Sequence, residues 1–158
     1  MDILADGKLD LSDSMLKRLD VVVAAIHYKF ELDARKQTER ILRAMDNKHV
    51  NILAHPSGRL LGEREAYAVD LERVIEGAKN RGVVLELNAH PARLDLDDVH
   101  CKLAKELGAK LVISTDAHST FGLDAMRFGI GQARRAWLER KDVLNTRPWP
   151  ALKKAITR

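Results

Sequence analysis

The sequence has one cysteine, few aromatic residues and no long apolar run. Because Cys101 has no second cysteine to pair with in its own chain, an intramolecular disulfide framework is excluded. We therefore expect a reducing, cytoplasmic setting in which Cys101 is a small buried residue. No run approaches the roughly 20 apolar residues that cross a bilayer, so no membrane partner is expected. Aromatic residues, at 4% of the chain, argue against a surface built to stack on single-stranded bases.

The composition is that of one globular unit. The chain has 158 residues, of which 46% are hydrophobic, and it contains no low-complexity segment or Gly/Ser linker, so we expect a single domain over residues 1–158. The formal net charge of +4 is mild. That charge is compatible with phosphate-bearing partners but does not by itself indicate nucleic acid.

Apolar runs and helical patterns alternate along the chain. The expected strands are residues 20–26, 50–54, 83–87 and 111–114, with a strand fragment at 1–4. The expected helices are residues 12–19, 33–45, 70–80, 95 or 97–107, 122–128, 131–138 and 149–156. Strand, loop and helix repeating at spacings of roughly 30 residues is typical of a parallel sheet built from βαβ units. A complete eight-unit barrel takes about 250 residues, so the sequence predicts an α/β fold with part of a barrel.

Each expected strand ends on a side chain that could do chemistry. His27 follows the first strand, His55 the second, Asn88 and His90 the third, and Asp116 and His118 the fourth. The carboxyl ends of parallel strands meet at one edge, so these residues are expected to converge. Imidazole and carboxylate together suit zinc, manganese or iron. A metal held in this way polarises a phosphoryl oxygen and lowers the pKa of bound water, which predicts a hydrolytic metal centre at this edge.

Each of these residues also has a structural alternative. A lone histidine at a strand end is more often a hydrogen-bonded structural residue than a ligand, and only the repetition favours metal. Asn88 could donate to a substrate oxygen or only cap the edge. His90 lies in a Pro-containing loop that could hold it away from the centre.

Seven further arginines and histidines stand out along the chain. Arg59 and Arg93 each follow one of the edge loops and could hold a substrate phosphate or form a surface salt bridge. His49 is expected at the opposite end of the sheet, and His100 in solvent on a helix. Arg127, with the neighbouring arginines 134 and 135, is expected on a helix surface.

Three loop motifs carry a family resemblance. The segments 55–62 (HPSGRLLG), 87–96 (LNAHPARLDL) and 114–119 (STDAHS) resemble the C-terminal part of the PHP (polymerase and histidinol phosphatase) domain. The similarity is strongest to the version attached to bacterial and archaeal family X DNA polymerases, and it extends through residues 129–146. The resemblance implies a partial (β/α)7 barrel of mostly parallel strands, with up to three metals at the carboxyl ends of its strands.

The resemblance also implies an activity and its residues. Polymerase-linked members are manganese-dependent 3′–5′ exonucleases and phosphoesterases that act on DNA ends in repair, and zinc is the other metal expected. By this likeness His27 and His55 would bind one metal, Asp116 a second and His118 a third. Arg59 matches the arginine of the family's His-Pro-x-Gly-Arg loop.

The chain departs from the family pattern at its start. The family's opening His-x-His motif, its middle ligands and its N-terminal strands have no counterpart, and its metal-bridging glutamate would stand just before residues 2–4. We therefore expect a fragment of a longer enzyme, with weakened metal binding, low activity and self-association through an exposed sheet edge. The alternatives are a small-molecule phosphatase of the histidinol phosphatase kind and a non-catalytic remnant.

Overall fold

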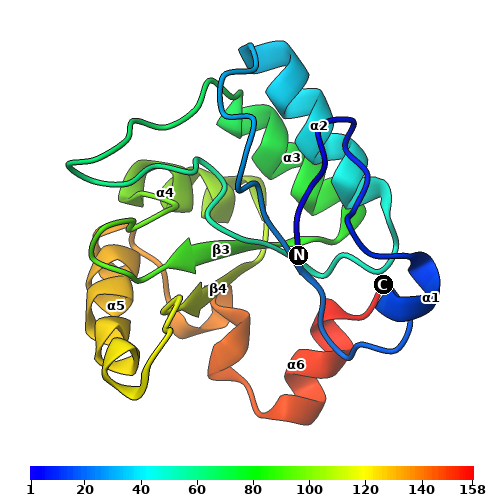
Figure 1. Cartoon of the computed structure of the whole chain (residues 1–158). Helices are drawn as coiled ribbons and strands as arrows, with labels where there is room; N and C mark the ends of the chain where they lie inside the picture. Colours follow the sequence, from blue (N-terminus) through cyan, green and yellow to red (C-terminus); the bar gives the residue numbers. More distant parts are fainter.

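A computed structural model describes all residues from 1 to 158, and it is an α/β fold built on one parallel sheet (Figure 1). The strands are β1 (Val23–Ala24), β2 (Ile52–Leu53), β3 (Val84–Asn88) and β4 (Leu111–Ser114). The α-helices are α1 (Asp13–Leu16), α2 (Ala34–Asp46), α3 (Leu71–Arg81), α4 (Asp98–Leu107), α5 (Met126–Arg135) and α6 (Trp149–Ile156). Short 3-10 helices are η1 (Thr120–Ala125), η2 (Arg140–Asp142) and η3 (Leu144–Thr146).

The strands are parallel and lie in the order β1-β2-β3-β4, as the βαβ pattern predicts. β1 and β2 pair over only two residues each, fewer than the apolar runs suggested. Part of the reason is Asn51, whose side chain accepts the backbone N–H of Val22. A side chain thus takes the place of a backbone partner at the residue just before β1. The sheet is open, which is compatible with part of a barrel but does not establish seven strands.

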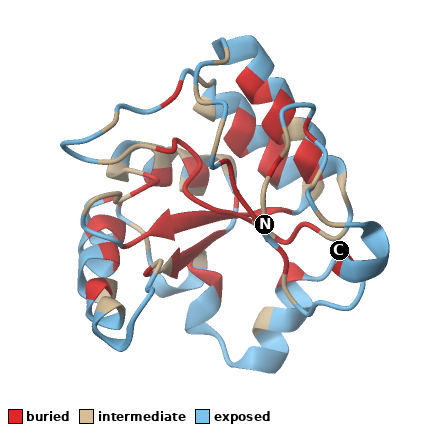
Figure 2. Cartoon of the chain, in the orientation of Figure 1, coloured by how far each residue is buried: buried red, intermediate tan, exposed pale blue.

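The two faces of the sheet are covered differently. The side chains of Leu85, Leu87 and Leu111 point into the main core, beneath α2, α3 and α4. Alternate residues of β3 and β4 point the other way, where Val84 and Val112 pack with Ile156 of α6 in a small second cluster. Figure 2 shows β3 buried along its whole length between these layers.

Helix ends follow the sequence signals closely. Asp33, Asp70 and Asp97 cap α2, α3 and α4, each accepting a backbone N–H from the first turn. Gly82 and Gly108 end α3 and α4 in left-handed backbone, where a residue without Cβ has little strain. These caps place the turns into β3 and β4 at the expected positions.

The region after β4 differs from the prediction. Instead of helices at 122–128 and 131–138, a 3-10 helix covers Thr120–Ala125 and one α-helix covers Met126–Arg135. Gly129 lies inside α5 because the helix packs closely on the sheet. A Cβ at Gly129 would come within 2.6 Å of Ala89 and Ile113 side-chain atoms. The glycine thus permits close packing and does not end the helix.

Both edges of the sheet are partly covered. Beyond β4, Val143 bridges Leu111, and the Asn145 side chain bonds to both the N–H and the C=O of Ile113. Beyond β1, residues 1–3 pair with Ala25, and the backbone and side chain of Asp10 in turn bond to Asp2. No helix is both long and apolar enough to span a bilayer.

Candidate active site

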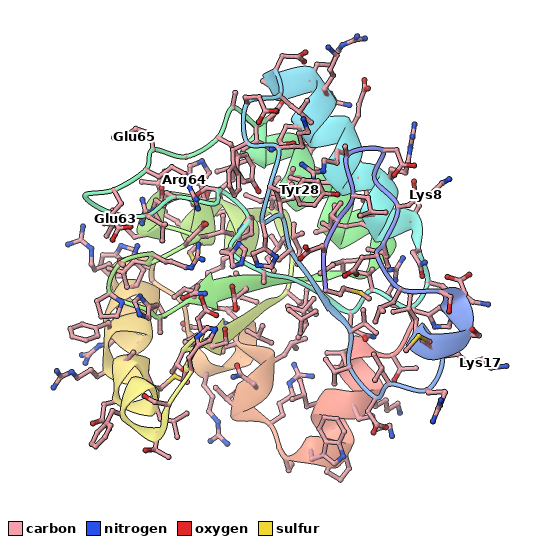
Figure 3. All side chains as sticks on the ribbon, in the orientation of Figure 1. Lys8, Lys17, Tyr28, Glu63, Arg64 and Glu65 are labelled. Carbon is pink, nitrogen blue, oxygen red and sulfur yellow. The ribbon has the colours of Figure 1, made fainter.

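The carboxyl ends of the parallel strands bring the predicted residues to one edge of the sheet. Figure 1 shows β3 and β4 pointing the same way, with the long loop between β2 and α3 extending past their tips. Figure 3 places Glu63, Arg64 and Glu65 on that loop, whereas Lys17 lies on the opposite side of the molecule. The site is therefore built from the loops that follow β1, β2, β3 and β4.

His27 and His55 lie together at the ends of the first two strands. Their ring centroids are 5.1 Å apart in an edge-to-face arrangement. The His27 Nδ1 atom is 2.5 Å from an Asp2 carboxylate oxygen, so this carboxylate fixes one side of the ring. A histidine held through one nitrogen presents the other to a ligand, as metal-binding histidines do.

His55 is buried and conformationally constrained. The residue is 4% exposed, its φ is +30°, and its Nδ1 atom is buried without a hydrogen-bond partner. Burial lowers the pKa of His55 to about 4, and the positive charge of Arg93 and the neighbouring His27 act in the same direction. The imidazole is therefore neutral near pH 7, the form that binds metals.

Asp116 lies two residues past β4 and pairs with Arg93. The Arg93 Nε donates to Asp116 Oδ2 over 3.0 Å, and Asp116 has left-handed backbone with φ +54°. Burial alone would raise the pKa of Asp116, but the Asn88 amide and the Arg93 guanidinium outweigh it and hold the pKa below its usual range. Asp116 is therefore a carboxylate at neutral pH.

His118 contacts the site only through Asp116. Its Nδ1 lies 2.7 Å from the Asp116 carbonyl oxygen, and the side chain is exposed. The loop that carries His118 then folds back. A Cβ at Gly122 would lie 3.0 Å from Ala117.

The two arginines have different environments. Arg59 donates to the carbonyls of Arg93 and Leu94 and lies 3.6 Å from an Asp97 carboxylate oxygen. These contacts favour the salt-bridge alternative for Arg59, which holds the 90–95 loop in place. Arg93 has one nitrogen, NH1, that is buried without a partner, so this arginine keeps a donor free for a ligand.

Asn88 and His90 diverge after β3. Asn88 is fully buried, and its Oδ1 accepts the His90 N–H over 3.0 Å. The His90 ring is exposed and its Nδ1 accepts the Ala92 N–H. His90 is thus turned toward its own loop, the outcome that the proline at 91 suggested.

Two buried carboxyl groups beneath the loops were missed from the sequence. Glu86, in the middle of β3, accepts the His55 N–H over 2.6 Å, and burial raises the pKa of Glu86. Asp95 accepts the N–H groups of Ser57 and Gly58, and burial raises the pKa of Asp95 to about 6. A charged residue inside an apolar strand, Leu85-Glu86-Leu87, was the available signal for Glu86.

The remaining predicted residues lie away from the site. Cys101 is fully buried, as expected. His100 is not free in solvent, because its Nδ1 lies 2.7 Å from Asp97 Oδ1 and the ring is partly buried. The helix-surface prediction is confirmed for Arg127, Arg134 and Arg135, which are exposed on α5.

The arrangement fits a metal in part. No group of three or more His, Cys, Asp or Glu side chains is gathered closely enough to hold a metal ion. The donors come as two separate sets, the His27–His55 pair and Asp116 bonded to Arg93. The pair of imidazoles, of which His55 has a buried Nδ1 without a partner, suits a borderline transition metal such as zinc or manganese. Asp116 and His118 do not join that pair in this arrangement.

Comparison with known proteins places the chain near two groups. It is 48% identical over 147 residues to the DNA polymerase/3′-5′ exonuclease PolX of Bacillus subtilis, covering 93% of this chain and 26% of that protein. It is 30% identical over 150 residues to a probable phosphatase of Thermoanaerobacter sp. strain X514, covering 89% of this chain and 59% of that protein. It is 32% identical over 126 residues to a probable phosphatase of Shewanella sp. strain ANA-3, covering 75% of this chain and 48% of that protein.

These relatives are related to the chain over most of its length, but the chain spans only about a quarter of the polymerase and about half of the phosphatases. No family model matches the sequence. The shared names support a hydrolase of phosphate esters at the level of the family.

Proposed function

We propose that the chain is the C-terminal part of a PHP-type phosphoesterase, residues 1–158 forming one unit, and that its chemistry depends on a divalent metal. One observation carries the proposal. At the same edge of the sheet, His55 Nδ1 and Arg93 NH1 are both buried without a partner, and the Arg93 charge acts on His55. Buried polar atoms without partners are rare, and a bound ion or ligand is one way to satisfy them.

His27 and His55 would hold the metal, with Asp2 fixing the His27 ring. When bound, a metal of this kind polarises a phosphoryl oxygen and lowers the pKa of bound water. Arg93 has a free donor for a phosphate oxygen, and Arg59 keeps the Arg93 loop in position. Asp116 and His118 are assigned to further metals or to the reacting groups, as the family resemblance implies.

The favoured substrate is a DNA 3′ end, cleaved in the 3′–5′ direction during repair in the cytoplasm. The support is the higher identity to a protein named as a polymerase and exonuclease. A small phosphate ester, as in histidinol phosphatase, is the second candidate, supported by the relatives named as probable phosphatases.

Metal binding is the first test. We expect the purified chain to bind Mn²⁺ or Zn²⁺ in calorimetry, and His27→Ala to weaken that binding at least about tenfold, because one of two imidazoles is lost. His49→Ala is the matched control, since His49 follows α2 before the start of β2, at the opposite end of the strands. Equal affinity in the wild-type chain and His27→Ala would rule out the His27–His55 site.

Hydrolysis is the second test. We expect slow Mn²⁺-dependent removal of nucleotides from a 3′-ended oligonucleotide, lost in Asp116→Ala and removed by chelation. Faster hydrolysis of histidinol phosphate than of the oligonucleotide would select the second candidate. A chain that binds metal but hydrolyses neither substrate would be a non-catalytic remnant.

A further inference from the structure

Glu86 makes contacts at the carboxyl ends of three strands that form the site. It lies in β3 with its side chain on the face shared by Val84 and Asn88, opposite the main core. Its carboxylate accepts the backbone N–H of His55 at the end of β2 and the Ser114 hydroxyl at the end of β4. It also accepts the Asn88 amide N–H over 3.3 Å.

This carboxylate is buried without a cationic partner. Glu86 is 6% exposed, and no side-chain nitrogen of Lys, Arg or His forms an ion pair with it. Its compensation comes from an N–H, an amide and a hydroxyl, all belonging to residues at the strand ends. A buried carboxyl group needs hydrogen-bond donors to offset the cost of its burial, and the hydrogen bonds in turn hold the donor groups in position.

The contact to His55 matters most because the His55 backbone is strained. His55 has φ +30°, a value that L residues with side chains rarely adopt. Such a conformation persists only when neighbouring groups hold it. Glu86 Oε2, at 2.6 Å from the His55 nitrogen, holds the peptide on one side. On the other side, Gly58 N–H bonds to the His55 carbonyl and closes the turn.

We infer that Glu86 is a positioning residue for the candidate site: it sets the His55 backbone so that the imidazole faces His27, and it ties the ends of β2 and β4 together beneath that ring. This inference rests on the proposed function for its consequence in metal binding, but not for the geometry itself. The role needs hydrogen-bond acceptors at this place and does not need a negative charge.

Two variants separate acceptors from bulk. Glu86→Gln keeps an acceptor for His55 and an amide that can bond to Ser114, whereas Glu86→Met keeps the length of the side chain but accepts no strong hydrogen bond. Ile41→Ala, on the buried face of α2, is the control for general loss of stability.

The first readout needs no metal. In ¹⁵N-detected NMR of histidine rings, we expect Glu86→Gln to retain the wild-type His55 signals. Glu86→Met should shift or broaden those signals while the His49 and His100 signals stay unchanged.

The second readout is calorimetry with Mn²⁺ or Zn²⁺ at 10 °C on chains checked as folded by circular dichroism. We expect the affinity for the metal to be about tenfold weaker in Glu86→Met than in the wild-type chain. Glu86→Gln and Ile41→Ala should keep the wild-type affinity.

The two readouts keep this inference apart from the proposed function. Wild-type chain without metal binding would overturn the metal site, while the ring signals would still decide whether Glu86 sets His55. Wild-type ring signals in folded Glu86→Met would overturn the positioning role. Should Glu86→Met fail to fold, Ser114→Ala is the second variant, because it removes one of the three contacts alone. Unchanged His55 signals in Ser114→Ala, together with loss of the His55 signals in Glu86→Gln, would also overturn the positioning role.

Discussion

At the residue scale, burial shifts the pKa values of two groups beside the site, His55 and Asp95, in opposite directions. Burial lowers the pKa of His55 from its usual 6.5 to about 4. As the pH falls, the unfolded chain therefore binds a proton at His55 before the folded chain does. The stability that neutral His55 contributes to the folded chain is lost between pH 6.5 and about 4. Burial raises the pKa of Asp95 to about 6, so its contribution is present below its usual value of 3.8 and is lost as the pH rises through about 6. Between pH 4 and 6 the two contributions offset each other.

Asp95→Asn should reveal the His55 contribution. Asparagine does not titrate, so we expect the free energy of unfolding of this variant to fall more steeply than that of the wild-type chain as the pH drops from 6 to 4. Urea denaturation at several pH values, in the presence of chelator, measures the slope. Asp124→Asn, at an exposed position of η1, is the control and should keep the wild-type slope. Parallel curves for Asp95→Asn and wild type would contradict the prediction.

At the element scale, α5 contains two glycines in different surroundings. Gly129 is buried against Ala89 and Ile113, and a Cβ there would lie 2.6 Å from their side-chain atoms. Gly131 is exposed, with no atom within 4 Å of the position of a Cβ. The same substitution should therefore act with opposite sign at positions two residues apart.

Gly129→Ala should destabilise the chain by about 1–3 kcal/mol because overpacking outweighs helix propensity. Gly131→Ala should stabilise it by roughly 0.5–1 kcal/mol, because alanine favours the helix and meets nothing. Thermal and urea unfolding of the two variants measure the difference. Stabilisation by both would mean that α5 does not pack closely on the sheet.

These elements also define what the sequence could predict. Asp33, Asp70, Asp97 and the glycines 82 and 108 are local signals, so five boundaries of three helices followed from short patterns. The break expected between residues 128 and 131 was wrong, because Gly129 lies in contact with the sheet inside α5 and no local pattern records that contact. The positions of His27, His55 and Asp116 beyond the carboxyl ends of the strands could be predicted from the apolar runs that precede them. The Glu86 and Asp95 contacts depend on neighbouring strands and could not be seen in one segment.

At the scale of the whole molecule, the two partly covered edges of the sheet bear on association. The expectation that the chain self-associates through an exposed edge stays a prediction. The Asn145 carboxamide takes both backbone groups of Ile113, much as a neighbouring strand would. This side chain therefore protects the β4 edge from pairing with another chain.

Asn145→Ala should expose the backbone of Ile113. We expect the free energy of unfolding to fall by about 1–3 kcal/mol, because two part-buried hydrogen bonds to the Ile113 backbone are lost. We also expect a larger dimer fraction at high concentration. Light scattering after size-exclusion chromatography, compared with the exposed control Asn80→Ala, measures the second effect. An unchanged mass and stability would show that Asn145 does not guard the edge.

The carboxylate that fixes the His27 ring belongs to the second residue of the chain, and the amino group of Met1 bonds to the Val23 carbonyl over 3.0 Å. An affinity tag or fusion partner joined ahead of Met1 would therefore begin beside that carboxylate. A tag joined after Arg158 would emerge beside the start of β2, where Arg158 bonds to the Val50 carbonyl. Recombinant chains prepared for metal titration are best tagged at the C-terminal end.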